Sequence, residues 1–243
     1  WRFNDPIPAC LYPNAVGWHP PLRDYTTDLA WLQKAKTRIS VISAPSEELC
    51  DWMSEHVGLE HAHKAVWPHI GGHGSASAER LRFPGLYQSI EIAHIGGISD
   101  NRDPRPMFMA LGALRDAGHQ VTLHLHGDIH ANWRELAAAA ASGGSVCIHG
   151  ATSFVESLKV MQRYHALFLL EAKWDVGVFL PSKFADYVWA QRPVLAATPQ
   201  NSAVERLLGG PQYPGLLGFT PASTQDCLER FLHAMQTTDL TRY

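Results

Sequence analysis

The chain has 243 residues, of which 46% are hydrophobic and 18% are charged, and its formal net charge is −3 at pH 7. This composition indicates a folded globular protein and excludes a disordered one. The small negative charge gives no general attraction to nucleic acid, so we expect no nucleic-acid partner. No apolar run approaches the roughly 18 residues that a membrane-spanning helix needs.

The cysteines and histidines show no metal-binding spacing, and we expect no metal site. His124 and His126 alternate along one strand face, where two imidazoles could hold a metal, but no third ligand is evident and satisfied strand histidines are favoured. We expect reduced thiols, as in a cytoplasmic protein, at all four cysteines: Cys10, Cys50, Cys147 and Cys227.

The first part of the chain alternates between helix and strand. In order, we predict a helix ending over 28–35, a strand over 38–43, a helix over 44–57 and a strand over 65–67. Ser46 suits a helix N-cap, Glu47 an acidic first turn and Gly58 a helix stop.

Residues 69–84 interrupt this pattern, because they hold several glycines and show no apolar periodicity. We interpret them as a linker. A second alternating series follows. It comprises strands over 90–95, 121–125, 146–148, 166–170 and 193–196, and helices over 106–117, 132–141, 153–162, 182–190, 203–208 and 224–235.

Strands that alternate with helices predict an α/β fold with parallel sheets. Two series joined by a linker predict two Rossmann-like domains, of which the first is incomplete. We divide the chain into a partial first domain with its linker (1–84), a second Rossmann-like domain (85–215) and a helical segment (216–243). In parallel sheets, ligands bind at the carboxyl ends of the strands. We therefore expect ligand-binding residues in the loops that follow Ile95, Leu125, Ile148, Leu170 and Leu180.

The segment 181–196 holds the strongest candidate site. Pro181 and Ser182 suit the start of a helix, whose free N–H groups and partial positive charge attract phosphate. Lys183 adds a full positive charge, and Asp186 lies on the same helix face and could accept from ribose hydroxyls. From spacing alone, an ion pair between Lys183 and Asp186 on a solvated face is equally compatible.

The loop after the strand at 90–95 is a second candidate. Gly96 and Gly97 would let a ligand approach the backbone closely, and Arg102 could make bidentate contacts to a diphosphate. An ordinary strand–helix loop with a surface arginine would look the same.

Together these segments resemble one family. Residues 181–196 resemble the stretch PSK-x-x-E-Y-x-x-x-x-x-P-V-L-A of family 4 retaining glycosyltransferases, and residues 96–104 resemble their loop Y-x-G-S-x-x-x-x-R-x-P. Residues 149–158 resemble their G-x-V-S-x-x-E-x-L segment. Residues 44–58 and 66–68 resemble the helix and strand that precede the family's interdomain linker, so the resemblance covers essentially the whole chain.

The resemblance implies a GT-B fold whose second domain binds a nucleoside diphosphate sugar. Arg102 and Lys183 would be the catalytic cations. Phe3-Asn4-Asp5-Pro6 resembles the strand end F-R-D-P of the first domain, so Asp5 is a weaker catalytic candidate, and an Asx turn before Pro6 is favoured over it. The nucleotide-sugar-binding residues would be Gly96, Gly97, Arg102, His149, Ser182, Lys183 and Asp186.

The sequence departs from the family pattern at three positions. Asp186 stands where the family usually has Glu, which shortens the reach to ribose. Val178 stands where the other acid of the family's E-x7-E pair would fall. Gln191 stands where Gly usually ends the helix, and a left-handed conformation there would cost about 1 kcal/mol.

The implied function is transfer of a sugar from a nucleoside diphosphate donor to a glycan, lipid or small-molecule acceptor, with retention of configuration. It would need neither metal nor cofactor, because Arg102, Lys183 and a helix N-terminus would stabilise the leaving diphosphate. Two alternatives stay open: a noncatalytic nucleotide-sugar-binding subunit or fragment, and a nucleotide-sugar 2-epimerase. The match to the F-R-D-P strand end predicts that the first domain is truncated, that this chain transfers no sugar alone, and that the absent part could touch a membrane surface from the cytoplasm.

Overall fold

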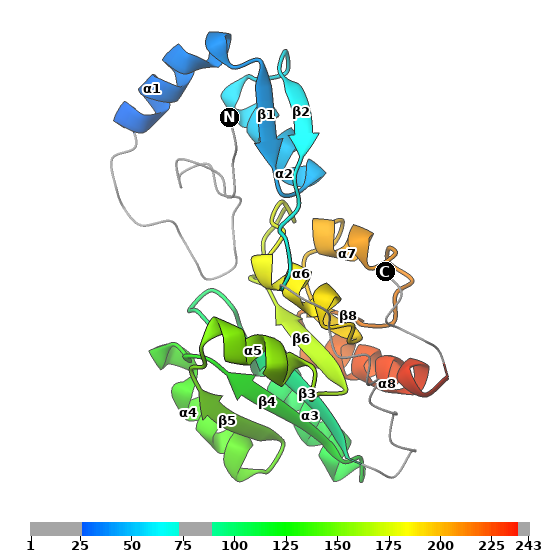
Figure 1. The fold of residues 1–243 in the computed structure, drawn as a ribbon. Helices are drawn as coiled ribbons and strands as arrows, with labels where there is room; N and C mark the ends of the chain where they lie inside the picture. Colours follow the sequence, from blue (N-terminus) through cyan, green and yellow to red (C-terminus); the bar gives the residue numbers. More distant parts are fainter. Residues whose placement is uncertain (1–25, 73–88, 238–243) are drawn as a thin grey trace.

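The computed structural model describes residues 26–72 and 89–237, in which helices alternate with the strands of two parallel sheets (Figure 1). The elements are α1 (Thr26–Ala35), the 3-10 turn η2 (Lys36–Arg38), β1 (Val41–Ala44), α2 (Glu47–Val57), β2 (His63–Val66), β3 (Ile90–Ile95), α3 (Arg105–Asp116), β4 (Val121–His126), α4 (Ala131–Ser142), β5 (Val146–Gly150), α5 (Phe154–Met161), β6 (Ala166–Leu170), α6 (Ser182–Trp189), β7 (Val194–Ala197), α7 (Ala203–Leu207), β8 (Leu216–Leu217) and α8 (Pro221–Thr237).

The N-terminal unit is a two-stranded parallel sheet, β1–β2, covered by α1 and α2. Ser46 caps α2 by accepting from the Leu49 N–H, and Gly58 ends the helix in the left-handed conformation, as the residue pattern predicts. The first strand begins later than predicted, at Val41, because Lys36–Arg38 form a 3-10 turn that continues α1.

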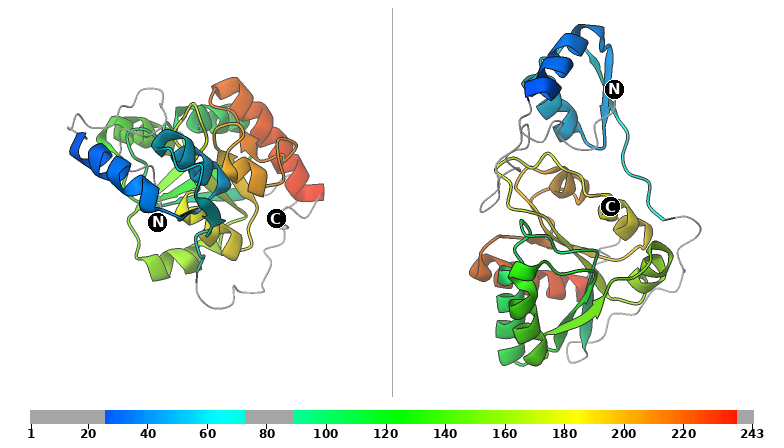
Figure 2. Two further views of the ribbon diagram at one scale, coloured as in Figure 1. Left: turned by 90° about the horizontal axis from the view of Figure 1, so that it is seen from above. Right: turned by 90° about the vertical axis from the view of Figure 1, so that its left-hand side faces the viewer.

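The second unit is a six-stranded parallel sheet in the order β5-β4-β3-β6-β7-β8. Helices α3, α4 and α8 pack on one face, and α5, α6 and α7 pack on the other (Figure 2). Because both faces of the central strand β6 are covered, all five of its residues are buried. This explains why β6 is a continuous apolar run rather than an alternating one.

The strand order places a switch point between β3 and β6. From β3 the chain moves outward through β4 and β5, and from β6 it moves outward in the opposite direction through β7 and β8. The loops that follow β3 and β6 therefore diverge and leave a crevice at the carboxyl ends of these strands, where open α/β sheets bind their ligands.

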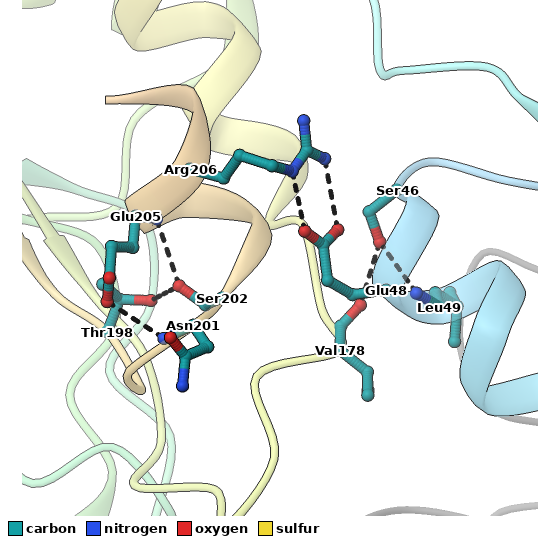
Figure 3. Close-up of polar contacts among 9 residues, drawn as sticks. All are labelled: Ser46, Glu48, Leu49, Val178, Thr198, Asn201, Ser202, Glu205 and Arg206. Carbon is teal, nitrogen blue, oxygen red and sulfur yellow. Dashed lines mark hydrogen bonds and ion pairs between the residues drawn. The ribbon is translucent and has the colours of Figure 1, made fainter. Parts of the chain in front are cut away.

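The N-terminal unit contacts the second unit around the β6–α6 loop and α7 (Figure 3). Val178 packs into the N-terminal core, and its carbonyl oxygen accepts from the buried Ser46 hydroxyl at 3.0 Å. The Arg206 guanidinium on α7 pairs with both carboxylate oxygens of Glu48 on α2, at 2.8 and 3.3 Å. Val178, which replaces an expected acid, is therefore an apolar contact between the two units.

The segment after β2 crosses α6 at close range. A Cβ added to Gly71 would lie 2.3 Å from the Ala185 carbonyl oxygen, and one added to Gly72 would lie 2.8 Å from the Leu158 side chain. This start of the predicted linker thus needs glycine for packing against the second unit. Residues 73–84 of that linker lie outside the described residues.

The α/β architecture with parallel sheets predicted from the sequence is confirmed. Gln191 adopts a left-handed conformation with φ 54°, at the position where the family pattern has glycine. The sequence analysis did not predict β8, which is two residues long and, among the described residues, pairs with β7 alone. Helix α8 packs against α3 over one face of the sheet, through residues such as Leu228 and Phe231.

Candidate functional site

A cavity of about 270 Å³ lies at the switch point. Its wall combines the loop after β3, the loop after β6 and the first residues of α6. The polar side chains among the described residues that line it are those of His69, Asn101, Arg102, Glu171, Ser182 and Lys183, together with the aromatic Trp174. Two cations and one buried acid thus meet where the topology predicts a ligand.

Lys183 lies in the first turn of α6 and points back toward the end of β3. Its Nζ donates to His94 Nε2 at 3.5 Å, while His94 Nδ1 donates to the Phe168 carbonyl at 2.9 Å. Burial, and then the charge of Lys183, hold the pKa of His94 well below its usual value, so this histidine is neutral. Burial and the nearby Arg102 lower the pKa of Lys183 to about 7. Without a ligand, the charged form of Lys183 is therefore destabilised, and a bound anion would stabilise it.

Arg102 supplies the second cation from the loop after β3. Its Nη1 donates to the Gly97 carbonyl oxygen at 3.2 Å, and the side chain lines the cavity. Burial lowers the pKa of Arg102 from its usual value, but the side chain stays protonated because that value is far above neutrality.

Gly96 explains how Lys183 comes so close to this loop. Its φ is +115°, and a Cβ there would lie 2.8 Å from Lys183 Nζ. Any other residue would be strained and would push the ammonium away.

Glu171 is the acid that the sequence reasoning missed. It follows β6 directly and is only 4% exposed. Its Oε1 accepts from the Thr198 hydroxyl at 2.6 Å, and Thr198 Oγ1 lies 2.7 Å from Ser202 Oγ. Burial raises the pKa of Glu171 to about 7, against the lowering effects of Thr198, Arg102 and Lys183. The sequence signal that could have identified it is an acidic residue directly after an apolar strand, at the edge of the sheet where ligands bind.

Helix α6 begins as the sequence predicts. Pro181 is its N-cap and has no side chain that accepts from the first turn. Ser182 is its first residue and lines the cavity. The partial positive charge of this helix end therefore adds to that of Lys183 and Arg102.

Three other candidates lie away from this wall or outside the described residues. Asp186 is not among the cavity-lining residues. Burial raises its pKa, while a hydrogen bond from the Gly72 backbone N–H lowers it, so its carboxylate meets the linker. Gly97 follows Gly96 in the loop, and a Cβ there would meet the Asp128 carbonyl oxygen at 3.4 Å. Asp5 lies outside the described residues.

His149 joins a histidine cluster on β4 and β5 instead of the cavity wall. Its ring stacks on His126 at 4.2 Å and on His124 at 5.1 Å. His126 Nε2 bonds the Tyr164 hydroxyl at 2.7 Å, and His124 pairs with Glu91. Burial and neighbouring imidazoles lower the pKa of His126 to about 4 and also lower that of His149. Among the described residues, the buried His126 Nδ1 has no hydrogen-bond partner. Within 26–72 and 89–237 no group of three or more His, Cys, Asp or Glu could hold a metal ion.

A second, wider cavity of about 790 Å³ lies beyond the carboxyl ends of β7 and β8. It shares Trp174 with the switch-point cavity and carries Lys173, Asp175 and Gln200 on its wall. The cations Arg102 and Lys183 do not line it. Charge therefore favours the smaller cavity for a diphosphate.

No helix within the part of the chain that the structure describes is long and apolar enough to cross a membrane. The three cysteines among those residues, Cys50, Cys147 and Cys227, are free thiols.

No protein-family model matches the sequence, and no curated protein matches it either. Solved structures do match by fold. HepE of Anabaena in complex with UDP has a TM-score of 0.62 at 14% identity, over 95% of this chain and 63% of HepE. A glycosyltransferase from Rickettsia africae has a TM-score of 0.60 at 12% identity, over 93% of this chain and 60% of that one.

The pneumococcal O-GlcNAc transferase GtfA, solved with UDP and GlcNAc, has a TM-score of 0.59 at 9% identity, over 88% of this chain and 40% of GtfA. These structures are GT-B glycosyltransferases, and the likeness shows that the chain has this fold. The chain spans between 40% and 63% of the length of these three proteins.

Proposed function

We propose that the switch-point cavity binds the diphosphate of a nucleoside diphosphate sugar, and that the protein acts in glycosyl transfer with retention of configuration. The observation that carries this proposal is the convergence of Lys183, Arg102 and the α6 N-terminus on one cavity of a GT-B fold. UDP complexes of the structural neighbours HepE and GtfA support the donor class.

The proposed chemistry follows from the charges. As the bond from the sugar to the diphosphate breaks, negative charge grows on the leaving diphosphate. Lys183 and Arg102 both line the cavity and attract that charge, in buried surroundings where their attraction is stronger than in water. We propose that these cations stabilise the leaving group and that no metal is needed for that role.

The two alternatives predict different products. A transferase releases free nucleotide and a glycoside, whereas a 2-epimerase would return an epimerised donor and a binding subunit would return the donor unchanged. The chain's coverage of only 40% of GtfA and 63% of HepE keeps the binding-subunit alternative open. The acceptor we propose is a glycan, lipid or small molecule, and free thiols at Cys50 and Cys147 support a cytoplasmic location.

Calorimetry with UDP, GDP and ADP tests the phosphate assignment. Lys183→Ala and Arg102→Ala should each weaken binding by about 1–3 kcal/mol, roughly 5- to 150-fold, because each removes a charge-assisted hydrogen bond. Lys173→Ala is the matched control, since this exposed lysine does not line the switch-point cavity. Unchanged affinity in both site variants would remove the diphosphate from this cavity.

Asp186 needs a separate test. If its carboxylate accepts from ribose hydroxyls, a 2′,3′-dideoxy nucleotide binds worse than the ordinary nucleotide to the wild type, and Asp186→Ala loses this preference. If both proteins discriminate equally, the contact with Gly72 is its role.

A further inference from the structure

Glu171 is a buried carboxylate on the wall of the switch-point cavity, and the proposed contacts to the diphosphate do not involve it. It is 4% exposed and is the only carboxylate among the described residues that line this cavity. None of the ion pairs among those residues joins it to Arg102 or Lys183. Glu171 is therefore not explained as the partner of Arg102 or Lys183 in a salt bridge.

The carboxylate is held in one orientation. Its Oε1 accepts from Thr198 Oγ1, and Thr198 is held in turn by Ser202, the N-cap of α7. Oε2 makes no hydrogen bond to the described residues. It is also not among the fully buried atoms that lack a partner, so it is accessible. Because Glu171 lines the cavity, Oε2 is the oxygen available to a ligand there.

This position is unfavourable for a site that binds phosphate alone. A carboxylate beside a diphosphate repels it, and burying the acid costs further free energy. The groups that an ionised carboxylate binds best are hydrogen-bond donors without negative charge, such as hydroxyls. A nucleoside diphosphate sugar carries such hydroxyls directly next to its diphosphate.

We propose that Glu171 recognises the donor's sugar, with Oε2 accepting hydrogen bonds from hydroxyl groups of a hexose whose diphosphate lies against Lys183 and Arg102. This inference rests on the proposed function and deepens it. The ligand class is a neutral hexose with free ring hydroxyls. Thr198 is a positioning residue because its hydroxyl holds Glu171 Oε1, and Ser202 acts on Glu171 only through Thr198.

Glu171 could instead be a counter-ion that only holds the two cations in place. The two accounts differ for the variant Glu171→Gln, which keeps the shape and removes the charge. If Glu171 binds the sugar, the sugar conjugate loses more affinity than the free nucleoside diphosphate does, because only the conjugate loses a contact. If it is a counter-ion, the free nucleotide and the conjugate weaken together.

The experiment measures dissociation constants of UDP, GDP and ADP and of their glucose, galactose and N-acetylglucosamine conjugates at pH 8. For the conjugate that binds best, the ratio of the dissociation constant of the free nucleotide to that of the conjugate reports the sugar contact. We expect Glu171→Gln to lower this ratio about tenfold, the difference between a charged and a neutral hydrogen bond. Asp175→Asn, which removes an acid from the wider cavity only, should leave the ratio unchanged.

The pH dependence supplies a second measurement. At each pH the ratio should be higher in the wild type than in Glu171→Gln, and this difference should grow between pH 6 and pH 8 as the Glu171 carboxyl, with its pKa of about 7, loses its proton. Comparing the two proteins at the same pH cancels the titration of the free nucleotide's own terminal phosphate, whose pKa is about 6. A ratio that is unchanged by the substitution at every pH overturns the inference while nucleotide binding upholds the proposed function. No binding of any nucleotide to the wild type overturns both. A thermal melt of each variant checks that it is folded.

Discussion

The affinity of the free protein for nucleoside diphosphate should fall steeply as the pH rises above 7. Lys183 loses its proton in this range, because burial and Arg102 lower the pKa of its ammonium to about 7. Only the protonated amine attracts the diphosphate, so binding of the anion at higher pH must first return a proton to Lys183.

The magnitude follows from the protonated fraction of that amine. With a pKa of about 7, roughly nine tenths of the amine is protonated at pH 6, half at pH 7, about one tenth at pH 8 and about one hundredth at pH 9. The apparent dissociation constant should therefore rise about fiftyfold from pH 7 to pH 9, a range in which the terminal phosphate of the nucleotide, with a pKa of about 6, is already ionised. Deprotonation of Glu171 in the same range adds repulsion and acts in the same direction.

Calorimetry with UDP at pH 7, 8 and 9 measures this slope. The Lys183→Arg variant keeps its charge throughout and should show a shallower slope than the wild type. The double variant Lys183→Met/Glu171→Gln has neither titrating group and should bind weakly with no pH dependence over this range. Equal slopes in the wild type and the double variant would refute the argument that these two groups face the diphosphate.

Three further predictions concern the parts that hold the site. Tyr187→Phe removes a buried hydroxyl that accepts from the Ile95 N–H of β3 at 3.0 Å and donates to the Phe168 carbonyl oxygen of β6 at 3.2 Å. Urea denaturation should show a loss of about 1–3 kcal/mol in the free energy of unfolding, and no loss would contradict these hydrogen bonds. Gly96→Ala should weaken UDP binding at least about tenfold by displacing the site's lysine, whereas Gly118→Ala, at φ +90° with open space, should change stability only. A double-mutant cycle of Arg206→Ala and Glu48→Ala should give a coupling energy of about 0.2–1 kcal/mol, as for other partly exposed ion pairs. A coupling energy near zero would show that this ion pair does not stabilise the contact between the two units.

The sequence predicts the elements of the fold better than their lateral order. The strand and helix segments follow from apolar runs, caps such as Ser46 and Ser153, and stops such as Gly58, because these signals are local. The switch point between β3 and β6 depends on which strands pair across long sequence separations, and no residue pattern reports that order. The two-residue strand β8 is too short to carry a period of its own.

The candidate site divides in the same way. Arg102, Ser182 and Lys183 were accessible because each lies in a loop or helix start whose chemistry is visible from neighbouring residues, and the structure brings them to one cavity. Glu171 was missed because its meaning depends on Thr198, a residue of the next strand end. His149 was interpreted through the family pattern, and its ring instead stacks within the β4–β5 histidine cluster.

A crystal structure of this chain in complex with UDP tests the central claim most directly. We expect a diphosphate between Lys183 and Arg102, at the start of α6 and within the cavity of about 270 Å³. A diphosphate bound in the wider cavity at β7 and β8, with Lys183 still against His94, would contradict it.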